Sequence, residues 1–348
     1  MSSIEVDNED GTTIEITERN EIESVCLVEN YKKYTQTEST ICMKEPLRTM
    51  LGPTGDSQFC ASILDGTDVF PVDTPAYTQE FFHNLQRLDN ASSRPIELRI
   101  TANDFKEGWG KMKEKTTSAS KTGLHFGHLK ACAQNSLLTE FESSIAHIPY
   151  VSGYTPQQWK EGTIVMIKKR EGLNNIKKLR SLVLTESDFN FNNKILGRRS
   201  IQHAEDIQGL APEQYGSRKF KCSIDQALHK KITYDIMRQT KRSGLLCSND
   251  AKSCFDRIVH SIAALAYKRI GIQQPPIECM LSGIQEMNHH IRTSFGLSFE
   301  SFNKHNTDCP LQGILQGNGA APTTWVLISV PLLNMLRKKA TVLNYFLL

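Results

Sequence analysis

The 348-residue sequence lacks the cysteine spacing of a zinc module. Its nine cysteines are scattered and no Cys-x-x-Cys pair occurs, which excludes zinc-ribbon and zinc-knuckle patterns. Free thiols in a reducing compartment are the simplest account of such cysteines. His125, His128 and Cys132 would share one face of a helix, but no fourth ligand accompanies them, so no zinc is expected.

Signals for membrane insertion and export are also lacking. The apolar run WVLISVPLLNML, residues 325–336, falls short of the ~20 residues that a membrane span needs, and Arg337 ends it. The acidic N-terminus has neither the basic region nor the apolar stretch of a signal peptide. We therefore expect a soluble, intracellular protein of the nucleus or cytoplasm, with no membrane partner.

Charge is unevenly distributed along the chain although the formal net charge is only +3. Residues 1–30 hold nine acids against Arg19 alone, whereas residues 160–243 hold 18 Lys and Arg against 9 acids. Such a basic block can follow a phosphate backbone by releasing its counterions, or it can be an ordinary solvated surface. Because residues 1–45 are acidic and poor in large apolar groups, we expect them to form a disordered arm.

Hydrophobic spacing predicts a mixture of helices and strands with no internal repeat. Helix 222–239 carries Ile224, Leu228, Ile232 and Ile236 on one face. A helix that begins at 253 or 254 points Ile258, Ile262, Leu265 and Ile270 inward and stops at Gly271. Further helices are expected at 104–115, 125–138 and 275–290, and strands at 163–168, 180–185, 244–251 and 291–296.

The stretch SNDAKSCFDRI, residues 248–258, follows a short apolar strand and leads into a helix. An acid at such a strand end can hold Mg²⁺ for two-metal phosphoryl transfer, which makes Asp250 a candidate ligand with the carbonyl of Ala251 beside it. Phe255 would turn back over the same site. Asp256 is better explained as an acid in the first helical turn, favoured by the helix dipole.

Two other stretches could bind phosphate. In IVMIKKREGLNNIKKLRSLVLT, residues 164–185, a hairpin would bring Lys169 close to Arg180, a pair suited to a triphosphate, although a charged hairpin rim would look the same. In PLQGILQGNGAAPTTW, residues 310–325, a glycine-rich loop precedes a helix. It matches neither a dinucleotide-binding fingerprint nor a P-loop, but glycines before a helix still permit close approach of a phosphate or base.

The order of these stretches resembles the reverse transcriptase family, in particular its non-LTR retrotransposon and group II intron branch. The first block of that family appears as Trp159, IVMIKK and RSL, and the second appears as QYGSR, residues 214–218, followed by a helix. The palm motif D-x-x-x-A-[FY]-D is similar to DAKSCFD, residues 250–256, and the motif R-Q-G-x-x-x-S-P is similar to LQGNGAAP, residues 315–322. The resemblance covers roughly residues 155–337.

This resemblance implies an α+β fold with the fingers and a partial palm of a right-hand polymerase in residues 151–348. A mostly helical or irregular extension, residues 46–150, to which the sequence assigns no chemistry, would precede it. The implied reaction is RNA-templated DNA synthesis, with an RNA template, a DNA primer and dNTP as partners and Mg²⁺ or Mn²⁺ as cofactor.

The implied metal-binding residues are Asp250, as catalytic carboxylate, and Ala251. The implied nucleotide contacts are Lys169, Arg180, Phe255 as a gate against the 2′-hydroxyl, Gln316 and Gly317. The implied nucleic-acid contacts are Gln214, Arg218 and Pro322.

The sequence departs from the family pattern at several positions. Ser181, Leu315 and Ala321 replace a Pro, an Arg and a Ser. The third palm motif, [FY]-x-D-D, is missing, since no Asp-Asp pair occurs among the 348 residues. We therefore expect this chain to stop before its catalytic hairpin and to be inactive as it stands. The alternatives are a non-catalytic nucleic-acid-binding module of retroelement origin and an unrelated nucleotide-binding enzyme that uses loop 313–322.

Overall fold

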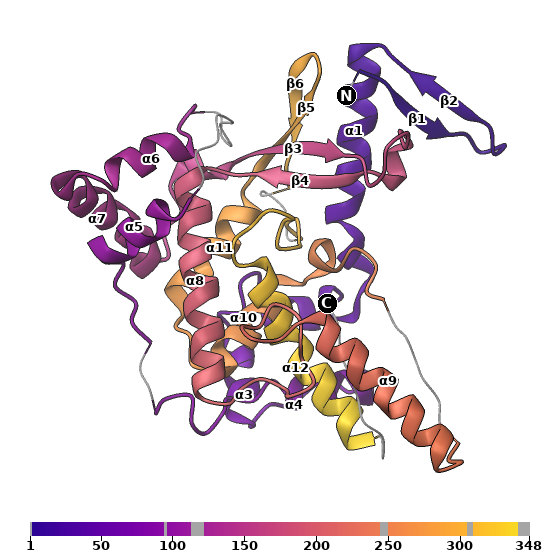
Figure 1. Cartoon of the computed structure of the whole chain (residues 1–348), viewed down its shortest axis with the longest axis vertical. Helices are drawn as coiled ribbons and strands as arrows, with labels where there is room; N and C mark the ends of the chain where they lie inside the picture. The colour runs from indigo at the N-terminus through magenta and orange to yellow at the C-terminus, as the bar shows by residue number, and fades with distance from the viewer. Residues whose placement is uncertain (1, 94–95, 113–121, 244–249, 305–308, 340–348) are drawn as a thin grey trace.

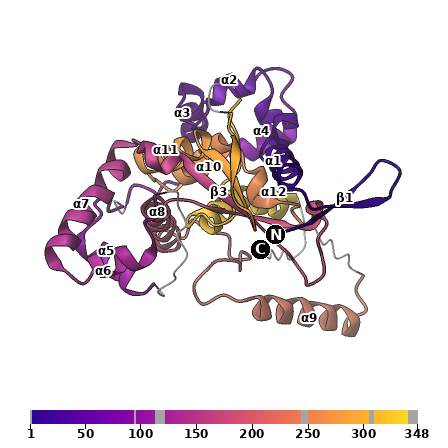
Figure 2. The same cartoon turned by 90° about the horizontal axis from the view of Figure 1, so that it is seen from above.

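The computed structural model describes residues 2–93, 96–112, 122–243, 250–304 and 309–339. Helices and strands are mixed, as the expected α+β class requires, and the helices surround one four-stranded sheet (Figures 1 and 2). A separate two-stranded sheet lies at the N-terminus. Among the described residues, none of the helices combines the length and the hydropathy that crossing a bilayer requires.

The N-terminal segment is folded, so the disordered arm expected for residues 1–45 is wrong. Strands β1 (Ile4–Asp7) and β2 (Thr13–Ile16) form a hairpin, and helix α1 (Arg19–Tyr34) follows. Ile22, Cys26 and Tyr34 of α1 are buried, and Tyr34 stacks on the ring of His289 with 5.3 Å between centroids. The acids dominate the composition, but apolar residues at helical spacing bury one face of α1, and this burial offsets the cost of ordering the segment.

Short helices connect α1 to the centre of the molecule. They are η1 (Gln36–Ser39), η2 (Ile41–Met43), α2 (Leu47–Leu51), α3 (Gln58–Asp65) and α4 (Ala76–His83). The Ser57 hydroxyl accepts a hydrogen bond from the Cys60 amide and caps α3. Gly66 ends the same helix in the left-handed conformation.

Helices α5 (Ala102–Gly110), α6 (Phe126–Cys132) and α7 (Ser136–Ser152) form a group at one side of the molecule (Figure 1). The helix expected at 104–115 begins two residues earlier, because Thr101 and Asp104 form a capping box. The helix expected at 125–138 divides into α6 and α7, since the Asn135 side chain caps a new start by accepting from the Leu138 amide.

The main sheet has the order β4-β3-β5-β6. Strands β3 (Glu161–Ile167) and β4 (Arg180–Leu184) are antiparallel, which confirms the predicted basic hairpin. Turn η3 (Gln157–Lys160) precedes β3, and turn η4 (Ile176–Lys178) precedes β4. The single strand expected at 291–296 is instead a hairpin of β5 (Asn288–Thr293) and β6 (Gly296–Phe302), and β5 runs parallel to β3.

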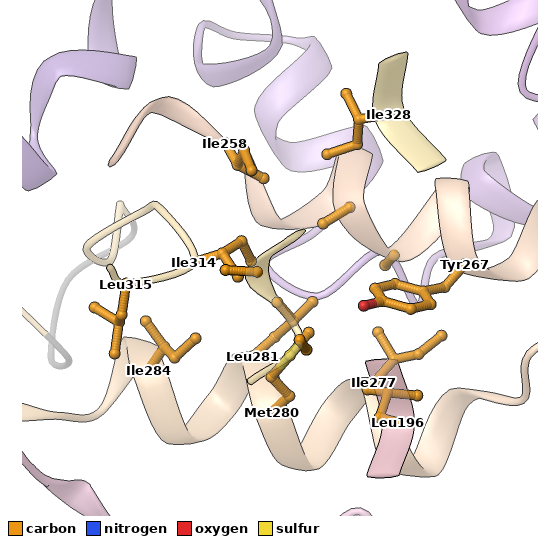
Figure 3. Close-up of a cluster of buried hydrophobic side chains, with 14 of the residues drawn as sticks. Leu196, Ile258, Tyr267, Ile277, Met280, Leu281, Ile284, Ile314, Leu315 and Ile328 are labelled. Carbon is orange, nitrogen blue, oxygen red and sulfur yellow. The ribbon is translucent and has the colours of Figure 1, made fainter. Parts of the chain in front are cut away.

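Four helices enclose the largest part of the core: α8 (Ser187–Asp206), α10 (His260–Arg269), α11 (Gln274–Gln285) and α12 (Ala321–Lys339). Figure 3 shows their side chains meeting around Tyr267, whose hydroxyl lies 2.8 Å from that of Thr324. The predicted inward residues Ile258, Ile262, Leu265 and Ile270 are all buried. The helix expected to carry them is interrupted, because turn η5 (Cys254–Arg257) precedes α10.

Helix α9 (Ser223–Gln239) confirms the helix predicted at 222–239. Its apolar face is exposed rather than buried, and Gln226 is its one buried residue within the described part of the chain. The strand expected at 244–251 lies outside the described residues except for Asp250 and Ala251, which belong to no strand.

Candidate functional site

The glycine-rich loop packs directly on the SCFD turn. The Gly313 amide donates to the Ile258 carbonyl at 2.9 Å, and the Ile314 amide donates to the Phe255 carbonyl at 2.8 Å. A Cβ added at Gly313 would lie 3.0 Å from backbone atoms of Asp256, so only glycine fits this approach without movement. We call residues 255–258, residues 313–319 and Val183 of β4 the junction.

The same loop is fixed to the basic hairpin. The Val183 amide donates to the Gln316 carbonyl at 2.8 Å. Gly317 has φ +117°, and a Cβ there would lie 2.6 Å from the Val183 carbonyl oxygen. Three stretches that are far apart in the sequence, namely the hairpin, the SCFD turn and the glycine-rich loop, therefore meet at one place.

Asn190 of α8 holds the loop from its other side. Its side-chain amide donates to the Gly317 carbonyl at 3.2 Å, and its oxygen accepts from the Gly319 amide at 2.7 Å. Sequence reasoning missed this residue. An asparagine inside a helix gives no signal of a partner about 130 positions further along the chain.

Asp256 is the buried acid of the junction, with 2% of its surface exposed. Gln316 Nε2 donates to both carboxylate oxygens, at 3.2 and 3.4 Å. Burial raises the pKa of Asp256 to about 6, although Gln316, Lys33 and Arg257 each oppose the rise. Asp256 lies in the first turn of η5, as expected, but it is buried rather than solvated, because the loop that covers it comes from sixty residues downstream.

Lys33 of α1 approaches the junction from the N-terminal segment. Its ammonium donates to the Ser181 hydroxyl at 2.9 Å, and that hydroxyl donates to Asn30 Oδ1 at 2.5 Å. Burial lowers the pKa of Lys33, while Glu29 and Asp256 act in the opposite direction. The Ser181 hydroxyl therefore links α1 to β4, a link that a proline at this position would lack.

The structure places Asp250 and Ala251 on the surface, in the stretch before η5. Among the described residues, no hydrogen bond or ion pair holds the Asp250 carboxylate. It lies near enough to Cys254 to contribute, after burial and Asp256, to raising the pKa of that thiol. Phe255 is half-buried and packs against the core at the junction.

Lys169 and Arg180 are both exposed at the end of the β3–β4 hairpin, where Arg180 pairs with Ile167. Six basic residues gather at this tip against one acid, Glu171: Lys168, Lys169, Arg170, Lys177, Lys178 and Arg180. Strand β1 reaches this tip, as Figure 1 shows. The Glu5 amide donates to the Asn174 carbonyl at 3.1 Å, and the Asn175 side chain donates to Asp7 at 2.7 Å.

Gln214 and Arg218 make internal contacts. The Arg218 guanidinium forms two bonds to the Glu205 carboxylate, at 2.7 and 2.6 Å, and also donates to the Ala211 and Gln214 carbonyls. Gln214 is fully buried and accepts from the Ser329 hydroxyl of α12 at 3.3 Å. In this structure both residues hold the turn before α9. Pro322 is exposed in the first turn of α12.

A cavity of about 250 Å³ lies beside the loop, behind Asn190. Its lining residues are Met112, Phe126, Ser187, Asn190, Phe191, Lys194 and Gly319. Burial, followed by the neighbouring Arg198, lowers the pKa of Lys194. Sequence reasoning gave no indication of this cavity, because its lining comes from four separate segments.

The donors needed for a metal do not converge within the described residues, where no group of three or more His, Cys, Asp and Glu side chains forms. Asp256, the acid nearest the loop, is covered by Gln316 and holds its proton more tightly than a metal ligand would. His125 accepts from the Gly127 amide and so caps α6, stacked on His128. No protein-family model matches the chain.

Proposed function

We propose that this chain is a nucleic-acid-binding module related to the reverse transcriptases, with a fingers hairpin and part of a palm. The basic hairpin tip and the glycine-rich loop would hold an RNA template paired with a DNA primer. The observation that carries the proposal is the junction, where three stretches ordered as in that family meet through Val183, Asp256 and Gln316. If the SCFD turn and the loop lay far apart, the proposal would fail.

The carboxylates among the described residues do not fit a two-metal centre. Such a centre needs several ionised carboxylates to hold cations ~3.5–4 Å apart. Among the described residues no other carboxylate joins Asp250 on its exposed stretch, and Asp256 accepts from Gln316 and has a raised pKa. We therefore propose binding without polymerisation by this chain. Any nucleotide transfer would need carboxylates from outside the described residues.

Binding would be electrostatic and centred on the hairpin tip. Lys169 and Arg180 are exposed and lie at neighbouring strand ends, so they can contact successive phosphates. Each lost phosphate contact reduces the slope of log K against log salt by about 0.7–0.9. The loop adds no charged side chain, and its exposed residue Gly317 lies beside β4, where it would face the nucleic acid.

The direct experiment measures the affinity of a labelled RNA–DNA hybrid by fluorescence anisotropy across a salt series. We expect Lys169→Gln/Arg180→Gln to weaken binding about tenfold and to flatten the salt slope by about 1.5. Lys106→Gln/Lys111→Gln, in α5 and at its C-cap, removes the same charge from exposed positions and serves as the matched control. Equal weakening by both pairs would contradict a site at the hairpin.

A primer-extension assay tests the catalytic part separately. With Mg²⁺, the hybrid and all four dNTPs, we expect the chain to extend the primer no more than Asp250→Ala does. Metal-dependent extension that Asp250→Ala abolishes would overturn the claim of binding without polymerisation, while leaving the binding site intact.

A further inference from the structure

Helix α7 is apolar on two opposite faces. One face is buried through Ala146, Pro149 and Tyr150. The other face exposes six large apolar side chains with accessible fractions between 37% and 76%: Leu137, Leu138, Phe141, Ile145, Ile148 and Val151. A helix that is hydrophobic all round is normally buried all round, so this second face indicates a partner. We call these six residues the α7 stripe.

Helix α9 carries a second exposed stripe. Ile224, Leu228, Ile232 and Ile236 recur at intervals of four and are 45–76% exposed. The His229 side chain of α9 lies 2.9 Å from the Tyr215 hydroxyl, and Gln226 is buried, so α9 contacts the rest of the described chain on the side away from these four residues. We call these four residues the α9 stripe.

The two stripes have opposite electrostatic surroundings. Helix α7 contains Glu140 and Glu142 and no Lys or Arg. Helix α9 and its flanks, residues 219–242, contain seven Lys and Arg against Asp225 and Asp235. Pairing two α7 helices would bring like acids together and pairing two α9 helices would bring like bases together, whereas α7 against α9 brings opposite charges together.

Within one molecule the two helices lie on opposite sides, as both views show (Figures 1 and 2). They therefore do not pair with each other inside one copy. We propose that the α9 stripe of one copy packs along the α7 stripe of a second copy. This inference does not depend on the proposed function, since it uses neither the junction nor the hairpin tip.

Such contact is heterologous, because each copy uses a different surface. A copy that is bound through α7 still has a free α9, so assemblies grow until they close into a ring or continue as a chain. Each helix has 17 residues and is therefore about 25 Å long. One pair of this length buries less than the about 800 Å² per partner of a standard interface, so we expect association at micromolar concentrations.

Sedimentation velocity on the full chain tests the proposal. We expect the weight-average mass of the unmodified protein to rise between about 1 and 100 μM. Phe141→Ser/Ile145→Ser on α7 and Leu228→Ser/Ile232→Ser on α9 should each stay monomeric alone. All four positions are exposed, so both variants should keep the far-ultraviolet circular dichroism and the melting temperature of the parent.

Mixing the two variants gives the sharpest readout. The α7 variant retains an intact α9 stripe and the α9 variant an intact α7 stripe, so a 1:1 mixture should form a dimer that grows no further. A mixture that stays monomeric overturns the proposal, as does an unmodified protein that is monomeric throughout. Self-association of either variant alone also overturns it, because that result assigns the contact to two copies of the same helix.

Charge reversal provides a second test that leaves the apolar stripes intact. Glu140→Lys/Glu142→Lys and Lys231→Glu/Arg238→Glu, which border the two stripes, should each self-associate more weakly than the parent, and their mixture should regain association. Weakening that persists in the mixture would contradict the charge pairing on which the choice of partner rests.

Discussion

At the junction, Asp256, Gln316 and Gly317 are each engaged by another segment of the chain, whereas the α7 and α9 stripes leave ten large apolar side chains in solvent. Asp256 and Gln316 belong to polar types that elsewhere usually lie on surfaces. The stripe residues belong to the types that proteins usually bury. Junction residues therefore stabilise the fold, whereas stripe residues are available to a partner. Substitutions at the junction should lower stability, and substitutions in the stripes should weaken association.

The largest effect is expected at Gly317. Its φ of +117° opposes any substitution, and so does the Val183 carbonyl oxygen, which would lie 2.6 Å from an added Cβ. Gly317→Ala should lower the free energy of unfolding by about 3 kcal/mol. Gly172→Ala is the control, since Gly172 has φ +78° with nothing nearby and should lose about 1 kcal/mol. Equal losses in urea unfolding would show that the close approach at the junction contributes nothing.

A matched pair on α7 tests the two faces of one helix. Tyr150 is 2% exposed, so Tyr150→Ala should cost about 3 kcal/mol through the cavity that it leaves. Phe141 is 61% exposed, so Phe141→Ala should change stability by no more than about 0.5 kcal/mol. Dilute protein must be used, so that association does not add to stability. If Phe141→Ala lowers the free energy of unfolding as much as Tyr150→Ala does, the α7 stripe is part of the buried core and not a free surface.

Asp256 predicts a pH dependence of stability. Its pKa is raised from 3.8 to about 6 by burial, so the folded state holds the proton more tightly than the unfolded state. The free energy of unfolding should therefore fall by about 2–3 kcal/mol as pH rises from about 4 to 6, and change little from this group above that. Asp256→Asn can still accept from Gln316 and should remove this fall. A variant with the parent's pH profile would assign the titration to another group.

The smallest effect is expected at the N-terminal hairpin. Glu5 and Asp7 lie against the basic hairpin tip, so Glu5→Gln/Asp7→Asn should tighten binding of the RNA–DNA hybrid about two- to threefold at low salt. The gain should vanish above about 0.5 M salt, where such charges are screened. Anisotropy titrations at both salt concentrations check this, and an unchanged affinity at low salt would exclude competition between this hairpin and nucleic acid.

Local patterns predicted several of the elements and the buried face of α10, but not the exposure of the apolar face of α9. The β-branched runs around Lys169 and Arg180 specified the hairpin, and spacing specified α9 and the inward face of α10. The same spacing gave no indication that α9 would leave its apolar face in solvent. The composition of the N-terminal segment wrongly predicted disorder. Its many acids outweighed the few apolar residues, such as Ile22 and Cys26, whose burial folds the segment.

The candidate site is formed by tertiary contacts that the spacing of residues in the sequence does not predict. Asp256 is buried because Gln316 and Gly313 lie on it, and Arg218 is occupied because Glu205 from the preceding helix faces it. The resemblance stays a prediction, and the meeting of these stretches at the junction is a contact that their spacing along the chain does not specify. The resemblance implied a role for Asp250, which is exposed, whereas Asp256 is the buried acid at the junction.

Hydrogen–deuterium exchange with and without the RNA–DNA hybrid, at one fixed protein concentration, tests the proposed nucleic-acid site most directly. We expect slowed exchange in peptides covering 167–180 and 313–319 when the hybrid is bound, with exchange in α5 unchanged. Binding of the hybrid that leaves exchange unchanged over both segments would contradict a nucleic-acid site at the hairpin tip and the junction.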